Sequence, residues 1–369
     1  SHFEDIKTLL IPIGIYNLSD LEKIYKLPLS NIIKQLPKEC ENHEELFAMS
    51  LIKGIGRVAI KHLLRQYDDI ESIRSMSDDE LSKQIKGRYK AEAINNLKTN
   101  FEKFLLDAEH KIEAMTETGI SVISIFDDNY PELYKQLTDK PLFLYVKGNT
   151  NLLNYQKNIA IVGTRNCTEF GRKIAFNTAQ KFSNLGYNIV SGLATGIDTA
   201  GHKGALSSKG FTTAILVDVE NIYPKENQKL SEDILDNNGM LLSENPPGTF
   251  SHRGLLVARD RLQSGLSIGV FPIETGIVGG TMHTVQFSQD QNRLLFCPDL
   301  EKIPNYPLET QACQGVLKLI NDKIAVPYSK NTYDQVVKDL ENKLFELSQE
   351  QNSKIYSKEN KNIEIFNNQ

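Results

Sequence analysis

The sequence predicts an α/β fold: a Rossmann-like, doubly wound and mostly parallel sheet that follows an N-terminal all-helical domain. Two apolar runs, residues 159–162 and 187–190, have the length of buried strands, and each stops at a turn of small residues that leads into a helical pattern. Three further runs repeat this order at residues 211–217, 239–244 and 268–273. Strands that alternate with helices in this way form a parallel sheet, whose ligands bind at the carboxyl ends of the strands.

The segments between these runs have helical patterns. Apolar side chains recur at helical spacing between Phe170 and Phe182, and Gly186 ends that helix. A second helix is expected from Gly196 to Ser208. The other expected elements are helices at residues 229–235, from Arg259 towards Leu266, from Gly279 onwards, from Gly315 to Ile320 and at residues 334–347, with a strand at residues 293–297.

The rest of the chain gives the domain organisation. One long helical pattern covers residues 90–118, and two strand-like runs, residues 119–124 and 142–149, lead into the main sheet. We therefore expect three parts. They are a helical domain at residues 3–115, an extended Rossmann-like domain at residues 116–325, and a C-terminal helix with a polar tail at residues 326–369.

Residues 51–64 read as an apolar helix, a glycine hairpin and an amphipathic helix. This pattern resembles a helix-hairpin-helix element and predicts an N-terminal domain of the helix-hairpin-helix or SAM-like type. Gly54, Gly56 and Lys53 are candidate DNA contacts, because glycines in a tight turn expose amide groups at the start of the next helix, where a phosphate can bind. The alternative is a turn of a helical bundle that needs glycine only for packing.

Composition restricts the class of protein. The 369 residues carry a net charge of −5 at pH 7, so a site for a polyanion has to be a local groove and not a general positive field. No apolar run is long enough to cross a bilayer. The four cysteines lack the paired spacing of zinc ligands or of a disulfide framework, which favours a cytoplasmic protein that binds no metal.

Three turns of small residues precede helices on the same predicted edge of the sheet. Their free amide groups and the positive ends of the helices suit a phosphate, and guanidinium groups bind phosphate oxygens in bidentate pairs. The candidate phosphate-binding residues are Gly163, Thr164, Arg165, Ser191, Gly192, Ala194, Gly196, Arg259, Arg261, Gly279, Gly280 and Thr281. The alternative is that these segments are tight turns without a ligand.

No spacing predicts a catalytic set. Glu274, Asp198, His202 and His283 are the candidate acids and bases, but an aspartate at a helix start is better explained as an N-cap. We expect Asp198, His202 and Lys203 to support the site, and we expect no cofactor. The lack of a Gly-Lys-Ser/Thr motif argues against a nucleotide-driven motor.

A series of motifs follows in a fixed order between about Leu51 and about Ala325. They lie at residues 127–131, 144–149, 161–165, 190–202, 205–210, 223–227, 243–249, 259–267 and 279–281. Together they resemble the DNA-processing protein DprA (Smf) family.

The resemblance implies a cytoplasmic, Rossmann-like protein that is not an enzyme and binds single-stranded DNA. It also implies a homodimer that loads a RecA-type recombinase onto incoming DNA in competence and natural transformation. By motif, Arg165 and the turn of Ser191 and Gly192 are expected to hold phosphates, and Arg259 and Arg261 are expected to line the same pocket.

Several positions depart from the family pattern. Residues 217–220 read Val-Asp-Val-Glu where the family has a Gly-x-Gly turn, so carboxylates stand where a phosphate is expected. Val257 and Ala258 replace an aromatic residue and an arginine, which removes a platform for base stacking. Asp260 replaces the usual asparagine. The C-terminal winged helix of some members is expected to be absent, because residues 326–369 are few and polar.

Two other functions stay open. The first is a nucleotide-binding sensor or nucleoside-phosphate hydrolase of the related Rossmann-like superfamily, with a role in defence. Those proteins use a Pro-Gly-Gly-x-Gly-Thr turn followed by a glutamate, and residues 278–283 lack the later glycine and the acid. The second is an interaction scaffold whose pocket has lost its ligand, which the acidic residues 218–220 suggest.

Overall fold

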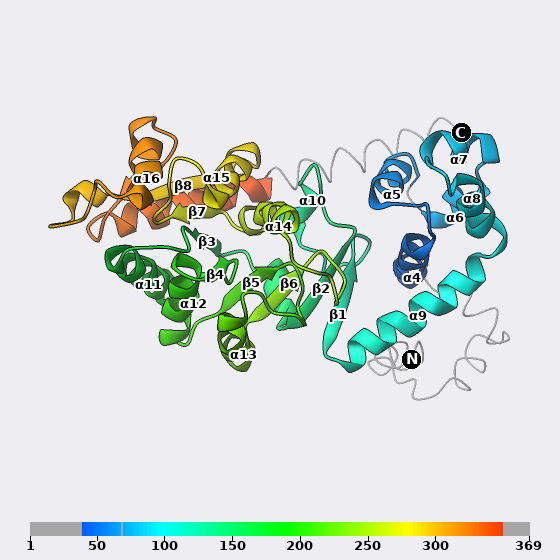
Figure 1. The fold of residues 1–369 in the computed structure, drawn as a ribbon, viewed down its shortest axis with the longest axis horizontal. Helices are drawn as coiled ribbons and strands as arrows, with labels where there is room; N and C mark the ends of the chain where they lie inside the picture. Colours follow the sequence, from blue (N-terminus) through cyan, green and yellow to red (C-terminus); the bar gives the residue numbers. More distant parts are fainter. Residues whose placement is uncertain (1–38, 68, 350–369) are drawn as a thin grey trace. The chain divides into compact units, whose positions relative to one another are not determined.

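The computed structural model describes residues 39–67 and 69–349 (Figure 1). The chain divides between Leu105 and Leu106 into two compact units, which we describe separately. The expected domain boundary near residue 115 stays a prediction, and residues 3–38 and 350–369 of the expected domains lie outside the described residues. Within the described ranges, no helix has both the length and the apolar character needed to span a membrane.

Short helices form the first unit. They are α4 (Glu39–Leu51), α5 (Arg57–Leu64), α6 (Ile70–Ser75), α7 (Asp78–Gln84) and α8 (Lys90–Thr99). The expectation of one helix over residues 90–118 is wrong, because α8 ends at Thr99, with Asn100 as its C-cap, before α9 (Phe101–Glu117) begins. Asn100 leaves the helical conformation at φ −112° and ψ 15°, as asparagine does readily at a helix end.

One sheet forms the centre of the second unit, in the order β1-β2-β6-β5-β4-β3-β7-β8-β9. At one edge, β1 pairs antiparallel with β2, and β2 pairs antiparallel with β6. The strands β6, β5, β4, β3, β7, β8 and β9, neighbours in this order, run parallel to one another. The bounds are β1 (Ile120–Ser124), β2 (Phe143–Gly148), β3 (Asn158–Val162), β4 (Asn188–Ser191), β5 (Thr212–Leu216), β6 (Met240–Ser243), β7 (Gly269–Pro272), β8 (Leu294–Pro298) and β9 (Val326–Tyr328). The predicted doubly wound, mostly parallel sheet is confirmed.

Helices cover both faces of this sheet (Figure 1). One face carries α11 (Glu169–Asn184), α12 (Ile197–Ser207), α13 (Gln228–Asp236) and the helix at residues 333–349. The other carries α10 (Glu132–Lys135), α14 (Arg253–Gly265), α15 (Gly280–Asp290) and α16 (Gln311–Asn321). Successive side chains of β3 serve opposite faces, since Ile159 and Ile161 join the first core and Ala160 and Val162 the second.

The start of α14 differs from the prediction. The helix begins at Arg253 and not at Arg259, because the His252 side chain caps it by accepting a hydrogen bond from the amide of Gly254 at 3.2 Å. Arg259 and Arg261 therefore lie inside a helix and not at a turn.

The strand order reverses between β3 and β7. The turns that follow these two strands lead to opposite faces of the sheet, which leaves room for a cleft between them. Glu274, which follows β7, is fully buried and ties the two turns together. Its carbonyl oxygen accepts from the amide of Thr164 at 2.8 Å. Its carboxylate accepts from the amide and hydroxyl of Thr168 at 2.8 and 2.6 Å, and from the hydroxyl of Tyr306. This candidate acid or base is thus enclosed in a structural network.

Tyr306 keeps its proton in this network. Burial raises the pKa of its hydroxyl far above the ordinary value, and the hydrogen bond to Glu274 raises it further. The hydroxyl therefore stays a donor to the carboxylate throughout the physiological range of pH.

We predict that Glu274→Gln lowers the free energy of unfolding by about 1–3 kcal/mol, because an amide NH₂ then faces groups that donate hydrogen bonds. Urea unfolding of the full chain measures the loss. Glu301→Gln is the matched control, since Glu301 is exposed and the same change there should cost less than about 0.5 kcal/mol. Equal stability of the two variants would show that the network does not hold the turns.

Candidate functional site

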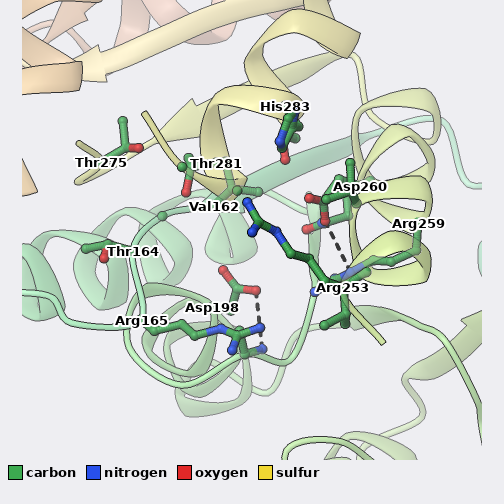
Figure 2. Close-up of a pocket in the computed structure, with 18 of the residues that line it drawn as sticks. Val162, Thr164, Arg165, Asp198, Arg253, Arg259, Asp260, Thr275, Thr281 and His283 are labelled. Carbon is green, nitrogen blue, oxygen red and sulfur yellow. Dashed lines mark hydrogen bonds and ion pairs between the residues drawn. The ribbon is translucent and has the colours of Figure 1, made fainter. Parts of the chain in front are cut away.

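A cleft of about 770 Å³ lies at the point where the strand order reverses. Its walls come from the turn after β3, the start of α12, the loop after β5, the loops before α14 and α15, and residues of those two helices as far as Gln263 and Thr284 (Figure 2). The predicted residues that line it are Gly163, Thr164, Arg165, Ala194, Asp198, Arg259, Gly279, Gly280 and Thr281. The predicted residues outside this lining are Ser191, Gly192, Gly196, His202, Lys203 and Arg261.

Two exposed arginines extend into the cleft. Arg165 follows β3 and Arg253 opens α14, and Figure 2 shows the Arg253 side chain reaching across towards Val162 and Thr281. Within the part of the chain that the structure describes, neither guanidinium has a hydrogen bond or an ion pair. Both are therefore available to an anionic ligand.

Arg259 lies at the floor of the cleft and is 5% exposed. Its Nη1 donates to the carbonyl of Ile215 at 2.9 Å, and its Nε lies 3.2 Å from a carboxylate oxygen of Asp260. The guanidinium occupies the space that a Cβ at residue 192 would need, so Gly192 is required by this arginine. Arg259 is thus held by protein groups, and its guanidinium forms part of the floor of the cleft.

Arg261 points away from the cleft. It forms a bidentate pair with the carboxylate of Glu244 at 2.6 and 2.7 Å, and it also donates to the carbonyl of Asp139 at 3.0 and 3.2 Å. Both carboxylate and guanidinium are buried, at 3% and 8% exposure of the side chains. The structure therefore leaves Arg261 out of the site, because its fork is already occupied by a carboxylate.

Asp198 organises the turn between β4 and α12. It is not the N-cap that its position suggested, since Gly196 holds that place without a side-chain bond. One carboxylate oxygen of Asp198 accepts from the amides of Gly192 and Ala194 at 3.2 and 3.3 Å. Burial raises the pKa of Asp198 in spite of the neighbouring Arg259 and these amides.

Gly196 brings the start of α12 against the turn that carries Arg165. Its φ of 84° lies in the left-handed region, and a Cβ there would collide with the carbonyl oxygens of Thr164 and Arg165. The next amide, that of Ile197, donates to the carbonyl of Thr164 at 3.3 Å. Gly196 therefore acts on the cleft through the backbone and not by binding a ligand.

The remaining supporting residues are structural or exposed. The hydroxyl of Ser191 donates to the carbonyl of Ile161 at 2.6 Å. His202 is fully buried, with Nδ1 2.7 Å from the hydroxyl of Thr212. Burial, and then Arg259, lower the pKa of His202 to about 3, so its ring is neutral at physiological pH. Lys203 is exposed and lies outside the cleft.

Two acids near the cleft behave differently. Asp260 lines it, and burial raises the pKa of its carboxyl to about 6, against the opposing effect of Arg259. Asp218 is 2% exposed and turns inward. It accepts hydrogen bonds from the amides of Glu220 and Gly248 and from the side-chain amide of Asn221, each at 2.9 Å. The carboxylate of Asp218 is therefore satisfied by the protein, although the sequence suggested that it would repel a phosphate.

Sequence reasoning missed Arg253 and the aromatic side chains of Tyr223 and Phe250, which also line the cleft. A signal for Arg253 was present, because Leu255 and Leu262 are seven residues apart and lie on one face of a helix that begins before Arg259.

In the first unit, the hairpin residues lie between α4 and α5 as expected. Gly56 is the N-cap of α5 without a side-chain bond. The ammonium of Lys53 lies 4.0 Å from the ring centroid of Tyr89, which belongs to a second hairpin between α7 and α8. Contact of Gly54, Gly56 and Lys53 with DNA stays a prediction. Throughout the described ranges, no cluster of three His, Cys, Asp or Glu side chains could hold a metal ion.

Comparisons with known proteins agree on one family. A family model described as DNA recombination-mediator protein A matches residues 121–341. DNA processing protein DprA of Bacillus subtilis is 32% identical over 243 residues, which cover 66% of this chain and 80% of that protein. Protein Smf of Synechocystis is 31% identical over 297 residues, which cover 79% of this chain and 72% of that protein.

Two solved structures share the fold. DprA from Streptococcus pneumoniae superposes with a TM-score of 0.61 at 26% identity, over 78% of this chain and 94% of that one. DprA from Helicobacter pylori, solved to describe its mode of binding single-stranded DNA, has a TM-score of 0.52 at 27% identity, over 60% of this chain and 96% of that one. The sequence motifs, the sheet order and these matches together place the chain in the DNA recombination-mediator protein A family, to which DprA and Smf proteins belong.

Proposed function

We propose that this protein binds single-stranded DNA in the cleft between β3 and β7 and acts as a recombination mediator. One observation carries the proposal: the exposed guanidinium groups of Arg165 and Arg253 enter the same cleft without partners among the described residues. The start of α15, whose N-cap Gly279 has no side-chain bond, adds free amides and a positive helix end to the same cleft. The relative from Helicobacter pylori that binds single-stranded DNA supports the choice of ligand.

The wider role follows from the family. We propose that the protein forms a homodimer and brings a RecA-type recombinase to the bound strand during natural transformation, without catalysing a reaction itself. A cleft that exposes more than one free arginine suits a chain of phosphates, because each phosphate can take one guanidinium.

We predict that Arg165→Ala and Arg253→Ala each weaken binding of oligo(dT) and each reduce the slope of log K against log salt concentration by about 0.7, the value for one phosphate of a single strand. Fluorescence anisotropy between low and moderate salt measures both quantities. Lys338→Ala is the matched control, because it removes one positive charge from an exposed position in the C-terminal helix, outside the cleft lining.

The result decides between functions. If both arginine variants kept the salt dependence of the wild type, the DNA site would have to lie outside this cleft. Failure of the wild type to bind oligo(dT) at low salt would remove the proposed function. Displacement of oligo(dT) by a mononucleotide at similar concentration would favour the nucleotide sensor instead.

We also predict that Asp260→Asn strengthens binding of oligo(dT) at pH 7.5 by about 1 kcal/mol, roughly fivefold, because a like charge near the phosphate is removed. Since the pKa of Asp260 is raised to about 6, this carboxyl is ionised at pH 7.5 and protonated at pH 5. The wild type should therefore gain affinity as the pH falls through 6, and its difference from the variant should vanish near pH 5.

The comparison of the two proteins isolates this carboxyl. His252 and His283 also line the cleft, but they are present in both proteins and cancel in the comparison. Asparagine can still accept the hydrogen bond that Gln263 donates to Asp260 at 2.8 Å, so the change leaves that contact in place. A constant difference between the two affinities from pH 7.5 to 5 would contradict the prediction.

A further inference from the structure

Large apolar side chains stand exposed around the mouth of the cleft. Phe250 is 84% exposed, Tyr223 47% and Val278 90%, and all three line the cleft. Ile277, next to Val278, is 53% exposed. Apolar groups of this size are expensive to leave in water, and apolar patches bordered by polar groups mark binding surfaces.

These side chains come from three loops at the same edge of the sheet. Tyr223 lies in the loop after β5, Phe250 in the loop after β6, and Val278 in the loop after β7. Neither aromatic ring is paired with another aromatic ring in the described part of the chain. Phe250 is also three residues before Arg253, so a free ring and a free guanidinium leave the same short segment.

The ligand that fits both groups is a nucleotide of a single strand. Its phosphate takes a guanidinium, and its base has a flat face that stacks on an aromatic ring. A duplex has the same phosphates, but its bases are paired and stacked inside, so it cannot offer these faces. Apolar side chains placed around the arginines therefore distinguish single-stranded from duplex DNA.

We infer that Phe250 and Tyr223, with Val278, form a base-stacking rim that gives the cleft its preference for single-stranded over duplex DNA. The inference rests on the proposed function and adds to it the groups that read the bases. The residues directly before Arg259 are Val257 and Ala258, so no aromatic ring stands there, and the exposed rings of the cleft come from two other loops.

The test uses the full chain and a matched pair of oligonucleotides, dT20 and a strand of the same length with abasic sites. Phe250→Ala should weaken binding of dT20 about tenfold and leave the salt dependence unchanged, because stacking involves no phosphate. The wild type should lose at least the same factor on the abasic strand, whereas Phe250→Ala should lose less on that strand, because only Tyr223 still stacks. Affinity for a 20-base-pair duplex should not change, so the preference for single strands falls.

Phe345→Ala is the matched control, because Phe345 is 66% exposed on the C-terminal helix and lies outside the cleft lining. A second readout uses Phe250→Trp: the chain contains no tryptophan, so its emission reports on residue 250 alone and should be quenched by dT20 but not by the abasic strand.

Two results would overturn the inference. In the first, Phe250→Ala and Tyr223→Ala bind dT20 as the wild type does. In the second, Phe250→Ala loses the same factor on both strands, which would mean that the ring only shapes the cleft. Either result leaves the phosphate site intact if Arg165→Ala still weakens binding, whereas absence of any binding by the wild type removes the proposed function itself.

Discussion

The buried carboxylate of Glu274 is the constraint on which the cleft depends. The strands β3 and β7 pair as far as Val162 and Ile273 and then lead into helices on opposite faces, so the separation of the turns that follow depends on contacts outside the sheet. Glu274 holds the turn after β3 through the amides of Thr164 and Thr168. Thr164 in turn accepts from the amide of Ile197 at the start of α12. Arg165 is therefore displayed from a backbone fixed at three places.

Burial and pairing assign different tasks to four arginines. Arg261 is buried with a carboxylate and fastens α14 to the end of β6. Arg259 is buried with a carbonyl and a neighbouring acid, and it fills the floor of the cleft. Arg165 and Arg253 are exposed and unpaired among the described residues. The guanidinium groups of Arg165 and Arg253 are free to exchange water and counterions for a phosphate. Those of Arg259 and Arg261 already contact protein groups in place of water.

The sequence predicted the sheet and the edge at which the site lies, because both follow from local patterns of strand, small-residue turn and helix. It could not separate Arg259 from Arg261, which are two residues apart. The partner of Arg261 is Glu244, at the end of another strand, and only the folded chain brings them together. The sequence could not show that the Asp218 side chain turns inward, for the same reason. The amide of Gly248, one of its hydrogen-bond donors, lies thirty residues further along the chain. The short strand β9 has too few residues for a recognisable pattern.

The inward turn of Asp218 has a mechanical consequence. One carboxylate oxygen takes hydrogen bonds from Asn221 and from Gly248, so it joins the loop that carries Tyr223 to the loop that carries Phe250. Because these hydrogen bonds join the two loops close to the sheet, we expect the loops to move together. We expect a displacement of one aromatic ring to displace the other, so that the proposed stacking rim responds to a ligand as one unit.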